Sequence, residues 1–263
     1  MKIASWNVNS LRVRIEHVLT WLEDNQPEIL CLQELKMTDE EFPELEFSKI
    51  GYHCAFTGQK TYNGVAILSR TPLQNVVTNL PGYDDPMRRY IAADVSYTDE
   101  GGKDTTLRIV NVYCPNGQAL DSDKFEYKRE WFKHLRSSFT ETLASYPNTV
   151  LVGDFNITPG DIDCHDPKRW RGKIHCSDTE RLMLQKLMSL GLYDTFRHFC
   201  SSGDRFSWWD YRGAGYRANE GLRIDLILSS ASMLERAKNC DIDETPRKLE
   251  RPSDHTPVIA SYV

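Results

Sequence analysis

The chain has 263 residues, of which 40% are hydrophobic and 27% are charged, a composition typical of a soluble globular enzyme. No apolar run approaches the ~18–20 residues that span a membrane, and we expect no signal peptide because MKIASWNVNS passes at once into a strand-like segment. The net charge of −6 is unusual for a protein that binds nucleic acid, although a site that collects divalent cations must itself be acidic.

The cysteines and basic residues limit the class of protein and its compartment further. The seven cysteines are scattered singly without a Cys-x-x-Cys pair, which argues against a disulfide framework or a structural zinc site. We therefore expect a reducing, cytoplasmic compartment. Basic clusters at 88–89, 168–173 and 247–251 are either solvated surface charge or contacts to a phosphate backbone.

Strand-like runs rich in Val, Ile, Tyr and Trp dominate the chain, and clusters of Gly, Pro, Asn and Asp separate them. In chain order the predicted strands are 2–6, 28–32, 52–56, 64–68, 90–95, 107–113, 149–153, 205–211, 223–229 and 257–263. Helices are predicted at 13–23, 123–143 and 177–191 from apolar spacing, with capping pairs Asp123–Glu126 and Ser177–Glu180. This mixture predicts an α+β fold or a layered sandwich in one domain, 1–263.

Two strand ends carry residues suited to a hard cation. Glu34 follows the apolar run 29–32, and a carboxylate at the open end of a buried strand would suit Mg²⁺. The alternative is an ordinary surface glutamate. Asn7 ends the first strand and could supply a carbonyl oxygen to the same ion or satisfy a turn. The similar endings of 3–7 and 151–156 suggest two halves that converge on one site.

Polar residues also follow two central strands. Asp154 and Asn156 alternate around Phe155, so both side chains point to one side of an extended chain. An acid that deprotonates water beside an amide that holds it makes a hydrolytic pair; the alternative is an Asx-type turn. Tyr113 ends another run before a turn, where its phenol could orient a phosphate oxygen and Asn116 could bind another. Strand-end tyrosines are more often packing residues.

A buried charge and an imidazole form the last pair. Asp225 lies inside an apolar run, where a charge needs a partner. His255 is the expected partner, because an imidazole held by a carboxylate stays cationic to higher pH and can bind a phosphate. A purely structural Asp–His hydrogen bond would give the same sequence. In the aromatic run 206–211 we expect one tryptophan in the core, and the other is either core or a pocket wall.

Eight motifs taken together resemble the exonuclease III family of abasic-site endonucleases, within the wider endonuclease/exonuclease/phosphatase superfamily. In chain order they are WNVNSLR (6–12), LQELK (32–36), YNGVAIL (62–68), NVYCPNG (111–117), GDFNI (153–157), FSWWDYRGAG (206–215), GLRIDLIL (221–228) and RPSDHTPV (251–258). The match is collinear over the whole chain. Its specificity lies in the ordered set, since any one motif could arise by chance.

The resemblance implies an α/β fold, a four-layered sandwich in which two packed mixed β-sheets are flanked by helices. It also implies a Mg²⁺- or Mn²⁺-dependent hydrolase that cuts the phosphodiester 5′ to abasic sites, trims blocked 3′ ends and degrades duplex DNA from the 3′ end. The expected partner is double-stranded DNA with abasic or 3′-blocked sites. No membrane contact is expected, and the chain is expected to be a monomer.

The resemblance further assigns expected roles. The metal would be held chiefly by Glu34, with Asn7 and Asp254 beside the ion and the pair Asp154 and Asn156 next to it. Asp154 would activate the attacking water, and Asn156 would position that water and the developing oxyanion.

The remaining roles concern the phosphate and the rest of the DNA. Tyr113 would contact the phosphate, and His255, oriented by Asp225, would neutralise its charge. The substrate-binding positions are Trp208, Leu222 and Ile224 for the abasic sugar, and Tyr62 and Asn116 for the backbone.

Two other functions remain as alternatives. Another phosphoesterase of the superfamily would share the metal and acid residues, but GLRID and the FSWW aromatics fit it poorly. A binding protein that kept the fold without the chemistry should have lost Glu34, Asp154 or His255, and all three are present.

Overall fold

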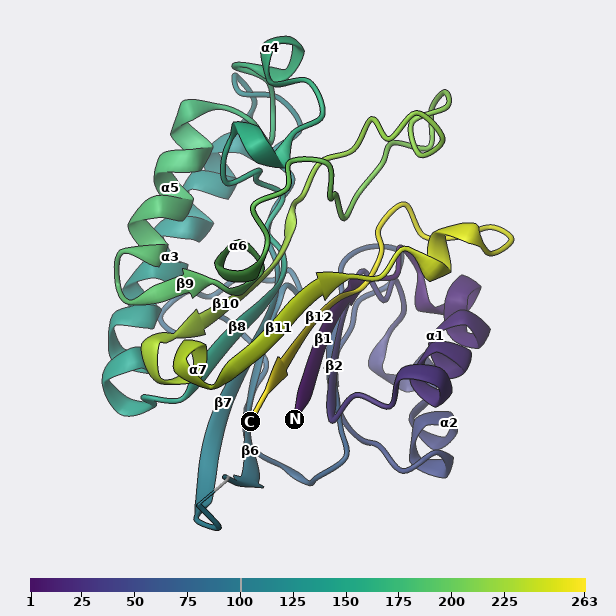
Figure 1. The fold of residues 1–263 in the computed structure, drawn as a ribbon, viewed down its shortest axis with the longest axis vertical. Helices are drawn as coiled ribbons and strands as arrows, with labels where there is room; N and C mark the ends of the chain where they lie inside the picture. The colour runs from purple at the N-terminus through teal and green to yellow at the C-terminus, as the bar shows by residue number, and fades with distance from the viewer. Residues whose placement is uncertain (100) are drawn as a thin grey trace.

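The computed structural model describes residues 1–99 and 101–263, and over these residues two six-stranded β-sheets pack face to face (Figure 1). In spatial order the first sheet contains β11 (Ala237–Ile242), β12 (Val258–Tyr262), β1 (Lys2–Asn7), β2 (Ile29–Gln33), β4 (Val65–Ser69) and β3 (His53–Thr57). The second contains β5 (Leu73–Val77), β6 (Tyr90–Thr98), β7 (Asp104–Tyr113), β8 (Thr149–Asp154), β10 (Asp225–Ser230) and β9 (Leu192–Asp194). Each sheet mixes parallel and antiparallel pairs.

Helices flank the two sheets. They are α1 (Leu11–Asn25), α2 (Glu44–Lys49), α3 (Asp123–Ser145), α4 (Pro167–Trp170), α5 (Asp178–Met188), α6 (Thr195–Phe199) and α7 (Ala231–Arg236), with short 3₁₀ turns η1 (Asp39–Glu41), η2 (Asp161–Asp163) and η3 (Thr245–Lys248). Figure 1 shows α1 and α2 against the first sheet and α3 and α5 against the second. The capping box of Ser177 and Glu180 is confirmed, whereas α3 is capped by Ser122. Within the described ranges, no helix is long and apolar enough to cross a membrane.

Three apolar layers hold the sandwich together. Between the sheets, side chains such as Ile67 and Val152 pack together with no exposed surface. Leu22 of α1 packs with the outer face of the first sheet, and Phe139 of α3 with that of the second. Strands buried on both faces must be apolar along their whole length, which explains the near-continuous hydrophobic runs of the sequence. The predicted sandwich of two mixed sheets flanked by helices is confirmed.

The strand directions bring one set of strand ends together. β1 runs parallel to β2, and β7 runs parallel to β8. Since parallel strands end at the same edge, Asn7 lies opposite Gln33, and Tyr113 lies opposite Asp154. The C-terminal strand β12 pairs antiparallel with β1, so the two termini lie side by side at the other edge (Figure 1).

One predicted strand is wrong and three were missed. Segment 205–211 is not a strand, because Trp208 forms isolated bridges to two different partners, Leu222 and His255, and no ladder continues on either side. The missed strands are β5, β9 and β11, which lie at the edges of the two sheets. Edge strands are partly exposed and carry more polar residues, so their sequence signal is weak.

Candidate active site

The predicted chemical residues meet at the edge where β1, β2, β7 and β8 end. Asn7 is the last residue of β1, and Asp154 is the last residue of β8. The Asn7 amide nitrogen donates 2.9 Å hydrogen bonds to the carboxylates of both Asp154 and Glu34. The two strand endings that were predicted to converge therefore do so.

Several residues at this edge adopt left-handed backbone conformations. The φ angle is 44° at Asn9, 55° at both Glu34 and Lys36, and 52° at Asn156. Residues other than glycine rarely take such values. They persist where the surrounding structure holds them, and they cluster at functional sites. The turns after β1, β2 and β8 are thus held in conformations that ordinary loops avoid.

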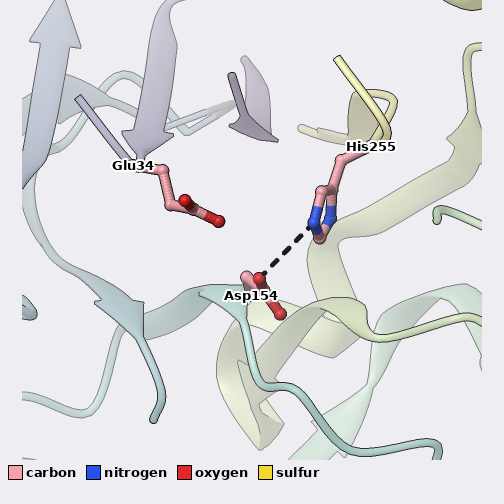
Figure 2. A group of neighbouring side chains, drawn as sticks. All are labelled: Glu34, Asp154 and His255. Atoms are coloured by element: carbon pink, nitrogen blue, oxygen red, sulfur yellow. Dashed lines mark ion pairs between the residues drawn. The ribbon is translucent and has the colours of Figure 1, made fainter. Parts of the chain in front are cut away.

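Glu34, Asp154 and His255 form a group that can hold a metal ion. One ligand atom of each lies within 4.8 Å of the others, and Figure 2 shows the three side chains facing a common space. The His255 Nε2 and the Asp154 Oδ2 are 3.7 Å apart. Carboxylate oxygens are the protein ligands that Mg²⁺ favours, so the residues present fit a small divalent cation.

Two nitrogen donors balance the charge of Glu34. The Asn7 amide is one, and the Lys36 ammonium, 2.9 Å from the other carboxylate oxygen, is the second. The Asn7 amide oxygen accepts a 2.9 Å hydrogen bond from the Asn9 backbone N–H. The amide thus presents its nitrogen to the carboxylates. A half-turn of that amide would bring its oxygen toward Glu34, as the expected ligand role requires.

His255 is held by the predicted carboxylate. Its Nδ1 lies 2.8 Å from Asp225 Oδ2, and Asp225 also accepts a 2.7 Å hydrogen bond from the Ser207 hydroxyl. Asp225 has no exposed surface and His255 is 4% exposed. Burial lowers the pKa of His255, but the carboxylates of Asp225 and Asp154 outweigh it and raise that pKa. The expected pairing is confirmed, and the imidazole is cationic at neutral pH.

The Asp154 carboxyl is buried in the site. It is 1% exposed, and its Oδ1 accepts a 2.9 Å hydrogen bond from the Asn156 backbone N–H. Burial raises the pKa of Asp154, whereas the nearby His255 opposes that rise. A carboxylate with a raised pKa, such as Asp154, binds protons readily, which suits a general base.

Tyr113 keeps its phenol proton. Burial and the negative charge of Glu34 hold the pKa of Tyr113 well above its usual range, so this phenol is a proton donor.

The two asparagines lie on adjacent loops. The Asn116 side-chain amide donates to Asn156 Oδ1 at 3.2 Å, and Asn156 Nδ2 donates to the Cys114 backbone oxygen at 3.0 Å. Asn156 is 4% exposed, whereas Asn116 is exposed. The loop after β7 and the loop after β8 thus act as one unit.

A cavity of about 560 Å³ opens beside Glu34 and Tyr113. Tyr62 and Asn116, both expected to contact the DNA backbone, line it. The Arg89 guanidinium also lines it and lies over the Tyr113 ring, 4.8 Å from its centroid. Aromatic faces and a cation suit a nucleic-acid strand.

The expected sugar-pocket residue Trp208 links Asp254, Leu222 and His255. The Trp208 indole N–H donates to Asp254 Oδ2 at 3.0 Å, and the Asn9 amide donates to Asp254 Oδ1 at 2.9 Å. Asp254 is therefore engaged by these donors and stands outside the Glu34 group. Leu222 is 0% exposed and Ile224 is 1% exposed. Both pack in one apolar cluster with two cysteines, and Trp208 covers it.

Two residues near the site were not predicted. His175 is 5% exposed, its ring lies 6.1 Å from the Trp208 ring, and its Nδ1 lies 2.7 Å from the Asn156 backbone oxygen. Lys128 is fully buried in α3. Its signal was present in the sequence, since it follows Phe125 by three residues and precedes Phe132 by four, on the apolar helix face. No comparable pattern points to His175.

Comparisons with known proteins agree with this geometry. Residues 4–255 match the Endonuclease/Exonuclease/phosphatase family. An exodeoxyribonuclease III from Haemophilus influenzae is 36% identical over 272 residues, covering 100% of both chains. A 3′ phosphatase (NExo) from Neisseria, bound to a product DNA hairpin, superposes with a TM-score of 0.94 and 48% identity, covering 100% of this chain and 99% of that one. An AP endonuclease from Archaeoglobus fulgidus superposes with a TM-score of 0.89 and is 34% identical, covering 100% of this chain and 99% of that one.

These likenesses extend over the whole chain, and the residues that carry the motifs are the ones gathered at the sheet edge. The chain therefore belongs to the endonuclease/exonuclease/phosphatase family, and it is a nuclease of the exodeoxyribonuclease III and AP endonuclease type.

Proposed function

We propose that this chain, residues 1–263, is a single-domain, metal-dependent DNA-repair phosphoesterase. Its substrates would be duplex DNA with abasic sites, where it cuts the phosphodiester 5′ to the lesion, and duplex DNA with blocked or free 3′ ends. The observation that carries the proposal is the convergence of Glu34, Asp154 and His255 at one sheet edge. The activities named for the relatives support it. We further propose that it works as a monomer in the cytoplasm.

Glu34 and Asp154 would hold the cation, Mg²⁺ or Mn²⁺, with Asn7 beside them. Asp254 and Asn156 remain proposed as neighbours of the ion. When bound, such an ion polarises the phosphate and stabilises the leaving oxygen. The Lys36 and Asn7 donors occupy the two Glu34 oxygens, so a cation would take the place of at least one of them.

The protein residues would carry the proton and the charge. Asp154 takes a proton from water as the water oxygen attacks phosphorus, and Asn156 positions that water. The ester oxygen leaves on the opposite side. His255, cationic and oriented by Asp225 at 2.8 Å, binds the phosphate as its charge grows. Tyr113 donates its phenol proton to a phosphate oxygen as a hydrogen bond.

Of the two substrate types, the geometry favours the 3′ end. A pocket for an extruded abasic sugar was expected at Trp208, Leu222 and Ile224. Leu222 and Ile224 have almost no exposed surface, and His175 fills the space between Asn156 and Trp208. An internal abasic nucleotide would have to displace these side chains, whereas a 3′ terminus has no continuing strand to accommodate. We therefore propose faster reaction at 3′ ends.

One experiment tests both the proposed activity and the proposed preference for 3′ ends. Single-turnover rates with Mg²⁺ are compared on four duplexes: one with a 3′-phosphate, one with a free 3′-hydroxyl, and two with protected 3′ ends that carry either a central abasic site or no lesion. The proposal expects reaction on the first three, fastest at the 3′-phosphate. Equal rates on the abasic and intact duplexes would refute lesion recognition, and no reaction on any duplex would refute the function as a whole.

A further inference from the structure

One buried cation supports the loops of both active-site asparagines. Lys128 in α3 has no exposed surface. Its Nζ donates to the backbone oxygens of Asn116, at 3.1 Å, and Asn156, at 2.8 Å, and to Glu180 Oε1 at 2.6 Å. An ammonium group has three N–H donors. All three are used inside the protein, so Lys128 has no donor left for substrate.

Glu180, the partner, connects the pair to a third loop. It lies in α5 and has no exposed surface. Its Oε1 also accepts from the His175 backbone N–H at 3.0 Å. Its Oε2 accepts from the backbone N–H of Ser177 at 3.2 Å and from its hydroxyl at 2.6 Å. The ion pair thus ties together the loops after β7, after β8 and before α5.

Asn156 is held from both sides by this arrangement. Its backbone oxygen accepts from Lys128 and lies 2.7 Å from His175 Nδ1, and its backbone N–H donates to Asp154 Oδ1 at 2.9 Å. Its φ of 52° is a value that needs such support. The position of the Asn156 amide therefore depends on Lys128.

Stability alone does not explain a charge at this place. Taking two charges out of water costs several kcal/mol per ion, and apolar replacements of buried ion pairs are often equally stable. The neighbouring residues on this helix face, Phe125 and Phe132, are apolar and buried. An apolar residue here would fill the space, but it would leave the Asn116 backbone oxygen without its donor and the Asn156 backbone oxygen with His175 Nδ1 alone.

We propose that Lys128, held by Glu180, is a positioning residue that fixes Asn116 and Asn156 for phosphate-ester hydrolysis through their backbone oxygens, without touching substrate. This inference rests on the proposed function. A positioning role lowers kcat and leaves KM nearly unchanged, because the displaced groups act on the reacting phosphate.

Three variants separate positioning from stability. Lys128→Met leaves Glu180 buried and unpaired. The double variant Lys128→Met/Glu180→Met removes that charge but still takes the Lys128 donor away from both backbone oxygens. The matched control is Arg108→Met, which breaks another buried pair, Arg108–Asp94, on β7 and β6. Arg108 donates to Asp94 and Asn75 and contacts neither asparagine loop.

Kinetics are measured on a 3′-phosphate duplex with Mg²⁺, beside thermal unfolding and amide hydrogen exchange. Both Lys128 variants are expected to lose about 100-fold in kcat, the loss caused by small misplacements of reacting groups. The kcat of the double variant is expected to stay low although the unpaired buried charge is gone. Its thermal stability is measured separately, because Glu180→Met also removes the acceptor of His175 and Ser177. Exchange at residues 114–118 and 155–158 is expected to speed up in both Lys128 variants and to stay unchanged in Arg108→Met.

The inference is overturned if the double variant recovers kcat together with stability, or if KM rises while kcat stays at the wild-type value. If the wild-type protein hydrolyses none of the DNA substrates, the proposed function fails instead. In that case unchanged exchange at the two loops would still overturn the positioning role.

Discussion

Asp154→Asn tests the assignment of the general base with almost no change in shape. The carboxylate accepts two 2.9 Å hydrogen bonds, from the Asn156 backbone N–H to Oδ1 and from the Asn7 amide to Oδ2. An amide has only one oxygen, so one of these two donors would face an NH₂ group. The substitution also removes the buried negative charge.

The substitution has two effects of different size, one on folding stability and one on turnover. An unsatisfied buried donor costs about 1–3 kcal/mol of folding stability, partly offset because a buried charge is removed. Loss of a general base lowers turnover by about 10²–10⁴-fold, which is roughly 2.7–5.5 kcal/mol of activation free energy. We therefore expect turnover to collapse while the protein stays folded. DNA affinity should hold or rise, since the substitution removes a negative charge near the phosphate.

The measurement is a single-turnover rate on a 3′-phosphate duplex with Mg²⁺, with DNA affinity measured by fluorescence anisotropy. Asp94→Asn is the matched control, because Asp94 is also buried and also accepts two hydrogen bonds, each of 2.8 Å, from Arg108 and Asn75. An Asp154→Asn rate within tenfold of that of Asp94→Asn would refute the assignment of Asp154 as the base.

Three further outcomes are expected. Excess EDTA should abolish hydrolysis, and added Mg²⁺ should restore it; cleavage that persists in EDTA would contradict the metal requirement. Gly153→Ala should lower the free energy of unfolding by roughly 3 kcal/mol, because the φ of Gly153 is 142° and an added Cβ would lie 1.9 Å from the Val112 backbone oxygen. Denaturant titration measures this loss, and an unchanged midpoint would contradict it. His175→Ala should raise the abasic rate relative to the 3′-phosphate rate, since it empties space beside Trp208; an unchanged ratio would count against the closed pocket.

The sequence alone predicted most of the residues that the structure brings together at the sheet edge. Asn7, Glu34, Tyr113 and Asp154 could be predicted because each ends or follows an apolar strand, and parallel strands bring such ends to one edge. The Asp225 partner could be predicted because a carboxylate in an apolar run needs a counterpart.

Other features depend on tertiary contacts that no local pattern contains. Asp254 and His255 are neighbours in sequence, yet their side chains bind different partners, Trp208 and Asp225. Leu222 and Ile224 fit the motif of a sugar pocket, but their burial could be seen only in the packed structure. The place of His175 could not be predicted either, because it contacts Asn156 and Trp208, which lie far from it in the sequence.

The pairing of the first and last strands has a consequence for synthesis. β12 joins β1 directly after His255, and the Ser253 hydroxyl donates to the Asn7 backbone oxygen at 2.7 Å. During translation β1 is made long before His255 and β12. Until that later segment is made, β1 lacks its antiparallel neighbour and the sheet edge lacks its imidazole. A chain that stops before His255 therefore cannot assemble the proposed site.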